Sequence, residues 1–297
     1  MTAPTLGFIA RPTLPPARHL ELARAVEAAG IDELWLWEDC FKETAVAGAA
    51  AVLGATERLR VGTGVLPVPL RNVALTAMEI ATIDGMFPGR LVPGVGHGVQ
   101  DWMGRVGARA ASPLTLLREH LTALRALLDG ERVTTRGRYV TLEDVVLDWP
   151  PATRPPVLSA AVGPRTLRLV GEHADGVILT SSTGLDRLPG ALEQVGAGRR
   201  AAGREEPFEV VVFVAVARRA EHLADTRAML AGEGHDVADD AGLARLAAWG
   251  EAEQVAATLR AYADAGATTV VAEPDAHEPD PEGLAAWFGQ EVAPLLR

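Results

Sequence analysis

The chain has 297 residues, 48% of them hydrophobic, and a net charge of −11 that arises from 39 acidic and 28 basic side chains. This length and composition predict one globular domain over residues 1–297 with a large buried core. The acidic balance, without long blocks of like charge, argues against nucleic acid and anionic membranes as partners, so we expect a small-molecule ligand.

Apolar runs of strand length alternate with helix-like segments along the whole chain. The predicted strands are Leu6–Ile9, Glu33–Trp37, Leu59–Val65, Leu91–Val95, Val157–Ala160, Gly176–Leu179, Glu209–Ala217 and Thr268–Glu273. Amphipathic stretches lie between them, such as His19–Ala29, which ends at Gly30, and Glu251–Ala265, which ends at Gly266. Eight strand–helix repeats predict an α/β fold, a (β/α)8 TIM barrel, with a doubly wound open sheet as the alternative.

Two stretches interrupt this alternation. Glu131–Pro156 has β-rich segments around Gly137 and then a Pro-rich turn, which predicts a hairpin before the fifth strand. Arg218–Trp249 predicts a mostly helical insertion after the seventh strand. Insertions at the carboxyl-terminal face of a barrel often form the substrate pocket, so both are candidates for its walls or lid. An additional packing element is the alternative for each.

The segment from Val157 to Leu179 predicts an anion site. It reads as a strand, a Gly-Pro turn, a helix and another strand, and Pro164 suits the first helical position because no N–H is needed there. Free N–H groups and the helix dipole would favour a phosphate at this point. The expected ligands are the backbone around Ala161, Val162 and Gly163 and the side chain of Arg165. An ordinary strand-to-helix turn is the alternative.

The other candidates for an anion are Arg11 and Arg71, because a negatively charged cofactor would need local arginines against the unfavourable overall charge. A surface ion pair is the alternative for Arg71. Cys40 is the only cysteine, so no internal disulfide can form and a cytoplasmic location is expected. No signal-like amino terminus or membrane span is expected, since the uncharged run Thr44–Thr56 is shorter than the roughly 20 residues of a span.

Five segments, taken in order, resemble the luciferase-like monooxygenase superfamily of flavin- and deazaflavin-dependent enzymes. They are Leu34–Phe41, Thr56–Asp84, Phe87–Gly98, Ala160–Leu179 and Gly250–Ala267. The Gly-Pro turn resembles the branch related to methylenetetrahydromethanopterin reductase and to glucose-6-phosphate dehydrogenases that use coenzyme F420. The resemblance implies hydride transfer between coenzyme F420 and a small organic substrate. FMN-dependent monooxygenation and a catalytically silent flavin-binding barrel are the alternatives.

The resemblance also implies roles for residues at the strand ends. A cis peptide between Gly64 and Val65 would support the cofactor ring from behind. Asp39 would contact the ring or the substrate, and Cys40 stands where deazaflavin relatives carry a histidine. The loop with Gly96 and Gly98 would wrap the cofactor. His97, in the same loop, is the candidate acid–base residue because an imidazole titrates in the useful range.

Three further expectations follow from the resemblance and the residues. Val99 and Trp102 stand where some relatives carry an acid and an amide that serve sugar-phosphate oxidation, so glucose 6-phosphate is not the expected substrate. No metal is implied. Many relatives are homodimers, and the Ala- and Leu-containing helix Ala74–Met86 is the candidate interface.

Overall fold

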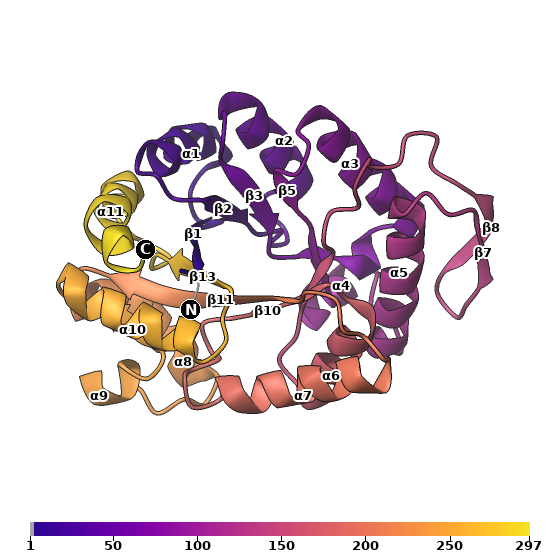
Figure 1. Cartoon of the computed structure of the whole chain (residues 1–297). Coiled ribbons are helices and arrows are strands. Elements are labelled where there is room, and N and C mark those ends of the chain that lie inside the picture. The colour runs from indigo at the N-terminus through magenta and orange to yellow at the C-terminus, as the bar shows by residue number, and fades with distance from the viewer. Residues whose placement is uncertain (1–2) are drawn as a thin grey trace.

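The computed structural model describes residues 3–297, and its central feature is a ring of parallel strands surrounded by helices (Figure 1). Six strands are continuous: β1 (Thr5–Ala10), β2 (Glu33–Leu36), β9 (Leu158–Ala160), β10 (Gly176–Leu179), β11 (Glu209–Ala217) and β13 (Thr269–Glu273). The third and fourth predicted strands are each split in two, into β3 (Arg60–Thr63) and β4 (Leu66–Pro67), and into β5 (Leu91–Val92) and β6 (Gly94–Gly96).

The pairing of the split strands closes the barrel. The lower half β3 pairs with β5, and the upper half β4 pairs with β6, which also pairs with β9. All neighbours in this ring are parallel, in the order β4, β6, β9, β10, β11, β13, β1, β2, β3 and β5. The predicted eight-stranded TIM barrel is therefore confirmed, and the open sheet is excluded.

A hydroxyl group holds the two split strands together. Thr63 Oγ1 accepts a hydrogen bond from the Gly94 N–H at 2.8 Å and donates one to the Gly94 carbonyl at 3.0 Å. A Cβ atom on Gly94 would lie only 2.2 Å from the Thr63 carbonyl oxygen, so only glycine allows this approach. The contact fixes the backbone one residue before the Gly64–Val65 peptide.

The helices cover the outside of the barrel (Figure 1). They are α1 (His19–Ala28), α2 (Ala45–Ala55), α3 (Val73–Met86), α4 (Gln100–Arg105), α5 (Pro113–Leu128), α6 (Pro164–His173), α7 (Leu188–Ala201), α8 (Ala224–Gly232), α9 (Asp240–Leu243), α10 (Ala252–Asp264) and α11 (Pro281–Trp287). Within residues 3–297, no helix has both the length and the apolar character needed to cross a bilayer.

The two predicted insertions lie in different places. The first forms the expected antiparallel hairpin, β7 (Val133–Arg136) and β8 (Thr141–Val145). It follows α5 and lies outside that helix (Figure 1), where Glu119 accepts hydrogen bonds from the backbone N–H groups of residues 138, 139 and 140. It therefore belongs to a helix-to-strand connection and does not extend from the carboxyl end of a strand, contrary to its expected place beside the pocket.

The second insertion follows the carboxyl end of β11, as predicted. It contains α8, α9 and a short additional strand, β12 (Ala247–Trp249), which pairs in parallel with the end of β11. Leu223, Leu230 and Leu243 are buried in a separate apolar cluster beneath this insertion. The insertion therefore extends the barrel wall at its carboxyl-terminal face.

The interior of the barrel is filled around Trp35. This side chain is 0% exposed, and Gly62 makes room for it, since a Cβ there would lie 2.3 Å from the indole. The indole N–H donates to Glu33 at 2.8 Å, and Arg60 lies 2.9 Å from the same carboxylate. Burial raises the pKa of Glu33 to about 7, although Arg60 opposes the shift. Trp37 lies on the same strand face, as period-two geometry predicts, and stacks on Phe213.

Candidate active site

The residues predicted for the site come from four neighbouring strands. Asp39 and Cys40 follow β2, Gly64 and Val65 separate β3 from β4, and His97 follows β6. The segment from Ala161 to Arg165 follows β9, the next strand in the ring. Parallel strands present their carboxyl ends at one face of the barrel, so these segments meet at its mouth.

Two contacts join these segments directly. The space that a side chain would fill at Gly96 is occupied by Val65, because a Cβ at Gly96 would lie 2.7 Å from Val65 Cγ2. His97 Nε2 lies 3.3 Å from the hydroxyl of Thr166, in the first turn of α6. Gly98 has a φ of +65°, which explains why glycine leads into α4. The loop after β6 is thus tied to β4 on one side and to α6 on the other.

The peptide bond between Gly64 and Val65 is cis, as predicted. A second non-proline cis bond joins Cys40 to Phe41, in the loop after β2. This second bond was not expected, because position 41 is not the proline that usually marks a cis peptide. Phe41 itself is 64% exposed.

The start of α6 is open. Gly163 is the N-cap residue and provides no side-chain cap, and a Cβ at this position would meet nothing within 4 Å. The Ala161 N–H donates to the Ile178 carbonyl at 3.2 Å, so this donor is not free for an anion, contrary to expectation. Because Pro164 has no N–H, the donors that this helix start leaves free are those of Gly163, Arg165 and Thr166.

The three candidate arginines differ in their partners. Arg11 forms a close ion pair with Glu273. Arg71 lies 2.7 Å from Glu38 and 2.8 Å from Glu79. It therefore forms ion pairs, which was the alternative to a role in binding an anion. Arg165 is exposed and forms no ion pair with any carboxylate among residues 3–297. Of the three, only Arg165 keeps an uncompensated charge for a ligand.

The titratable groups at the mouth are shifted by burial. Burial lowers the pKa of His97, so the ring is neutral at pH 7, with one nitrogen as donor and one as acceptor. Burial raises the pKa of Asp39, against the effect of Lys42 and Arg11. Burial, with Glu38 and Asp39 adding to it, also raises the pKa of the Cys40 thiol. Cys40 therefore stays protonated near neutral pH and is a poor nucleophile.

A cavity of about 270 Å³ lies between the ends of β1 and β13, and one of its lining residues, Arg11, acts electrostatically on Asp39. Its lining is largely apolar, with Ile9, Leu14, Leu22, Pro274 and Pro281. Its polar groups are Arg11, Thr13, Asp275, His277 and Glu278.

An arginine connects this cavity with the barrel interior. The Arg11 guanidinium lies 4.7 Å from the centre of the Trp37 ring, and Glu273, at the end of β13, is buried beside it. The sequence reasoning did not identify Glu273 or the cavity. The available signal for Glu273 was its position, since it is a charged residue at the end of the apolar run of the last strand.

Comparison with known proteins gives a consistent result. The luciferase-like monooxygenase family matches residues 3–232. The chain is 32% identical over 209 residues to 5,10-methylenetetrahydromethanopterin reductase of Methanolobus tindarius, an alignment that covers 70% of this chain and 63% of the reductase. It is 29% identical over 319 aligned positions to F420-dependent glucose-6-phosphate dehydrogenase of Kineococcus radiotolerans, covering 95% of this chain and 94% of that enzyme.

Solved structures share the fold. An F420-dependent secondary alcohol dehydrogenase in complex with an F420–acetone adduct superimposes with a TM-score of 0.88 over 100% of both chains, at 20% identity. At this identity the likeness concerns the arrangement of the barrel and its surrounding helices.

Proposed function

The chain belongs to the luciferase-like monooxygenase family, and from this we propose that it transfers a hydride between coenzyme F420 and a small organic substrate. One arrangement carries the proposal: an uncapped helix start with an unpaired arginine lies beside the half-buried, neutral His97 and the loop that contains Gly64 and Val65. When bound, the deazaflavin supplies hydride chemistry that no side chain can provide.

The residues present fit such a cofactor. The N–H groups at the start of α6 and the Arg165 side chain would hold its phosphate. Gly64 and Val65 would lie against the ring, and the loop with Gly96 and His97 would cover it. The neutral His97 ring has one nitrogen that can accept a proton, and its Nε2 lies 3.3 Å from the Thr166 hydroxyl. Asp39 would contact the ring or the substrate.

The substrate would occupy the cavity between β1 and β13. Its apolar lining and the carboxylates of Asp275 and Glu278 disfavour a phosphorylated substrate, in agreement with the absence of the family's acid and amide at Val99 and Trp102. Arg11 is the cavity's one guanidinium, and Glu273 already neutralises it. We therefore propose a small substrate that is uncharged and mostly apolar.

We expect Arg165→Ala to weaken binding of coenzyme F420 by about tenfold. A charge-assisted hydrogen bond contributes roughly 1.5–3 kcal/mol, and the exposure of Arg165 places it at the lower end of that range. The matched control is Arg168→Ala, which removes the same charge from the exposed side of the same helix one turn later. Fluorescence titration of the purified protein with the deazaflavin, and separately with FMN, measures both effects.

The same titration distinguishes the alternatives. Equal loss of affinity in both variants would show that only net charge matters and would remove the arginine contact. Tighter binding of FMN than of the deazaflavin would favour the monooxygenase. Binding of neither would contradict the proposed function as a whole.

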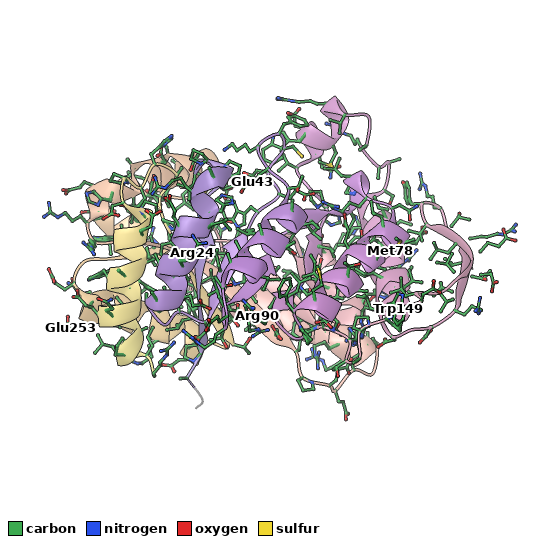
Figure 2. All side chains as sticks on the ribbon, turned by 90° about the horizontal axis from the view of Figure 1, so that it is seen from above. Arg24, Glu43, Met78, Arg90, Trp149 and Glu253 are labelled. Atoms are coloured by element: carbon green, nitrogen blue, oxygen red, sulfur yellow. The ribbon has the colours of Figure 1, made fainter. Side chains whose placement is uncertain are left out.

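A surface on α2 and α3 supports the expected homodimer. The eleven residues of α2 are all alanine, valine, glycine or leucine, so its outer side carries no charge. On α3, Leu75 is 46% exposed and Met78 and Met86 are each 56% exposed. Met78 is labelled on the outside of the molecule in Figure 2. Barrel helices that face only water normally carry charged side chains, so we propose that a second copy covers this surface.

We expect light scattering at micromolar concentration to give twice the chain mass of 31.3 kDa. Met78→Glu should shift the protein to monomers, because a charge at the centre of an apolar interface would be buried without a partner. Met229→Glu is the control, since Met229 is also exposed but lies on α8. A wild-type protein that is monomeric would exclude this interface.

A further inference from the structure

A buried imidazole and a buried carboxyl group face each other behind the mouth of the barrel. His19 begins α1, and Glu43 lies in the loop between β2 and α2. His19 Nε2 is 3.1 Å from Glu43 Oε2, and the two side chains are only 6% and 7% exposed. Figure 2 shows Glu43 at the opposite end of the barrel from Arg90, which precedes β5. The pair thus belongs to the carboxyl-terminal face.

The hydrogen bonds of His19 fix where a proton must lie. A backbone hydrogen bond joins the ring to Leu14 and raises its pKa, so the ring donates to that carbonyl. Because Nε2 faces Glu43, the donating nitrogen is Nδ1. In a neutral ring with its proton on Nδ1, Nε2 carries a lone pair and can only accept a hydrogen bond. Two lone pairs at 3.1 Å repel, and a single proton between Nε2 and the Glu43 carboxyl group would remove this repulsion.

The pair has no alternative partners. Nε2 of His19 and both carboxyl oxygens of Glu43 are buried, and none of the three has a hydrogen-bond partner within residues 3–297, so the nearest polar group to each is the other member of the pair. Burial lowers the pKa of His19. Burial, with the charge of Asp39 adding to it, raises the pKa of Glu43 to about 7. Both shifts favour the arrangement in which the carboxyl group and the ring together hold one proton and no net charge.

The charges around the pair are few and lie towards the proposed site. Asp39 and Lys42, from the same loop as Glu43, act on it with opposite signs, and Arg11 acts on Asp39 from the end of β1. Arg18, next to His19, is engaged at the surface by Glu21 and Glu282. Leu14, which accepts from His19, also lines the substrate cavity. The pair is therefore linked to the cavity on one side and to Asp39 on the other.

We propose that His19 and Glu43 share one proton at neutral pH and act as positioning residues that hold this proton beside Asp39 in the hydride-transfer site. The inference rests on the proposed function for the part that Asp39 plays. The proposal implies a coupling between the two sites. Negative charge at Asp39, or in a ligand beside it, raises the pKa of the His19–Glu43 pair. Oxidation of an alcohol to a carbonyl releases a proton together with the hydride, and the reverse reduction consumes both. A pair that binds a proton beside the site can therefore take up this proton in the oxidation and release it in the reduction.

Nitrogen-15 NMR of the histidine rings in the cofactor-free protein tests the shared proton between pH 5 and 9. The His19 signal is assigned by its loss in His19→Gln. We expect it to show a step near pH 7, where Glu43 titrates. Glu43→Gln should abolish the step while keeping the fold, because its amide has the same shape and can donate to Nε2. Glu57→Gln, at a side chain 87% exposed, is the control and should leave the step unchanged.

The coupling to Asp39 has its own measurement. Asp39→Asn should lower the midpoint of the His19 step by roughly 0.3–1 pH unit, because removing the negative charge that raises the pKa of Glu43 weakens the binding of the proton. An unchanged midpoint would overturn the coupling. In the enzyme with cofactor, the pH profile of kcat/KM should show the same inflection, and Glu43→Gln should lose it.

These outcomes separate the inference from the proposed function. A step near pH 7 in a protein that binds neither cofactor would support the shared proton and contradict hydride transfer. A His19 signal without this step, or with the same step in Glu43→Gln, would overturn the pair whatever the cofactor titration gives.

Discussion

Replacement of Gly94 by alanine is expected to destabilise the protein by about 3 kcal/mol, the upper end of the usual range for overpacking. The added methyl group would lie 2.2 Å from the carbonyl oxygen of Thr63 and 2.5 Å from Ile178 Cδ1. The first of these atoms is backbone, held in place by the two hydrogen bonds between Thr63 and Gly94. The strands must therefore separate, at the point where the barrel closes.

Urea unfolding of Gly94→Ala against the wild type measures this effect. Gly190→Ala is the control, because a Cβ there meets nothing within 4 Å on α7. Alanine in an exposed helix is expected to stabilise by about 0.5–1 kcal/mol relative to glycine. The sign of the change should thus differ between the two variants, and a stabilised Gly94→Ala would contradict the close contact between β3 and β6.

Trp35→Ala is expected to destabilise the protein by about 3–5 kcal/mol, a large part of the roughly 5–15 kcal/mol that holds a domain of ordinary stability. Two effects add. The indole fills the barrel interior between Gly7 and Gly62, so its removal leaves a cavity. It also donates to Glu33, whose buried carboxylate would then keep only Arg60 as partner.

Thermal and denaturant unfolding measure the loss, with Trp149→Ala as the control. Trp149 is 87% exposed, so its removal should change the stability by less than about 0.5 kcal/mol. A small effect at Trp35 would mean that the interior repacks, for which Phe213, 5.5 Å away, is the available side chain.

Much of the fold could be predicted from the sequence, because strand and helix periodicity depend on local residue patterns. All eight barrel strands were found, and the hairpin around Gly137 was located from its β-rich flanks. The cis peptide between Gly64 and Val65 was expected, but the division of the third and fourth strands into two parts each was not. This division depends on the Thr63–Gly94 contact, which joins residues 31 positions apart and leaves no local pattern.

Site residues that follow strand ends could be predicted from the sequence. Site residues whose role depends on a side chain from another element could not. Gly163 and Arg165 could be placed at a helix start from the strand–turn–helix order alone. The roles of Arg71 and Arg11 could not, since their carboxylate partners come from other elements. The same holds for His19 and Glu43, which lie 24 positions apart and looked like an ordinary helix residue and an ordinary loop residue.

The residues proposed to hold the cofactor and those that line the cavity come from different segments of the chain. The segments around the cofactor follow β2, β3, β6 and β9 and end with the first turn of α6, whereas half of the cavity wall comes from residues after β13. Sequence change after β13 can alter which substrate fits without touching the groups that would hold the cofactor. Exchange of the segment after β13 between related proteins is therefore a direct route to new substrate preferences.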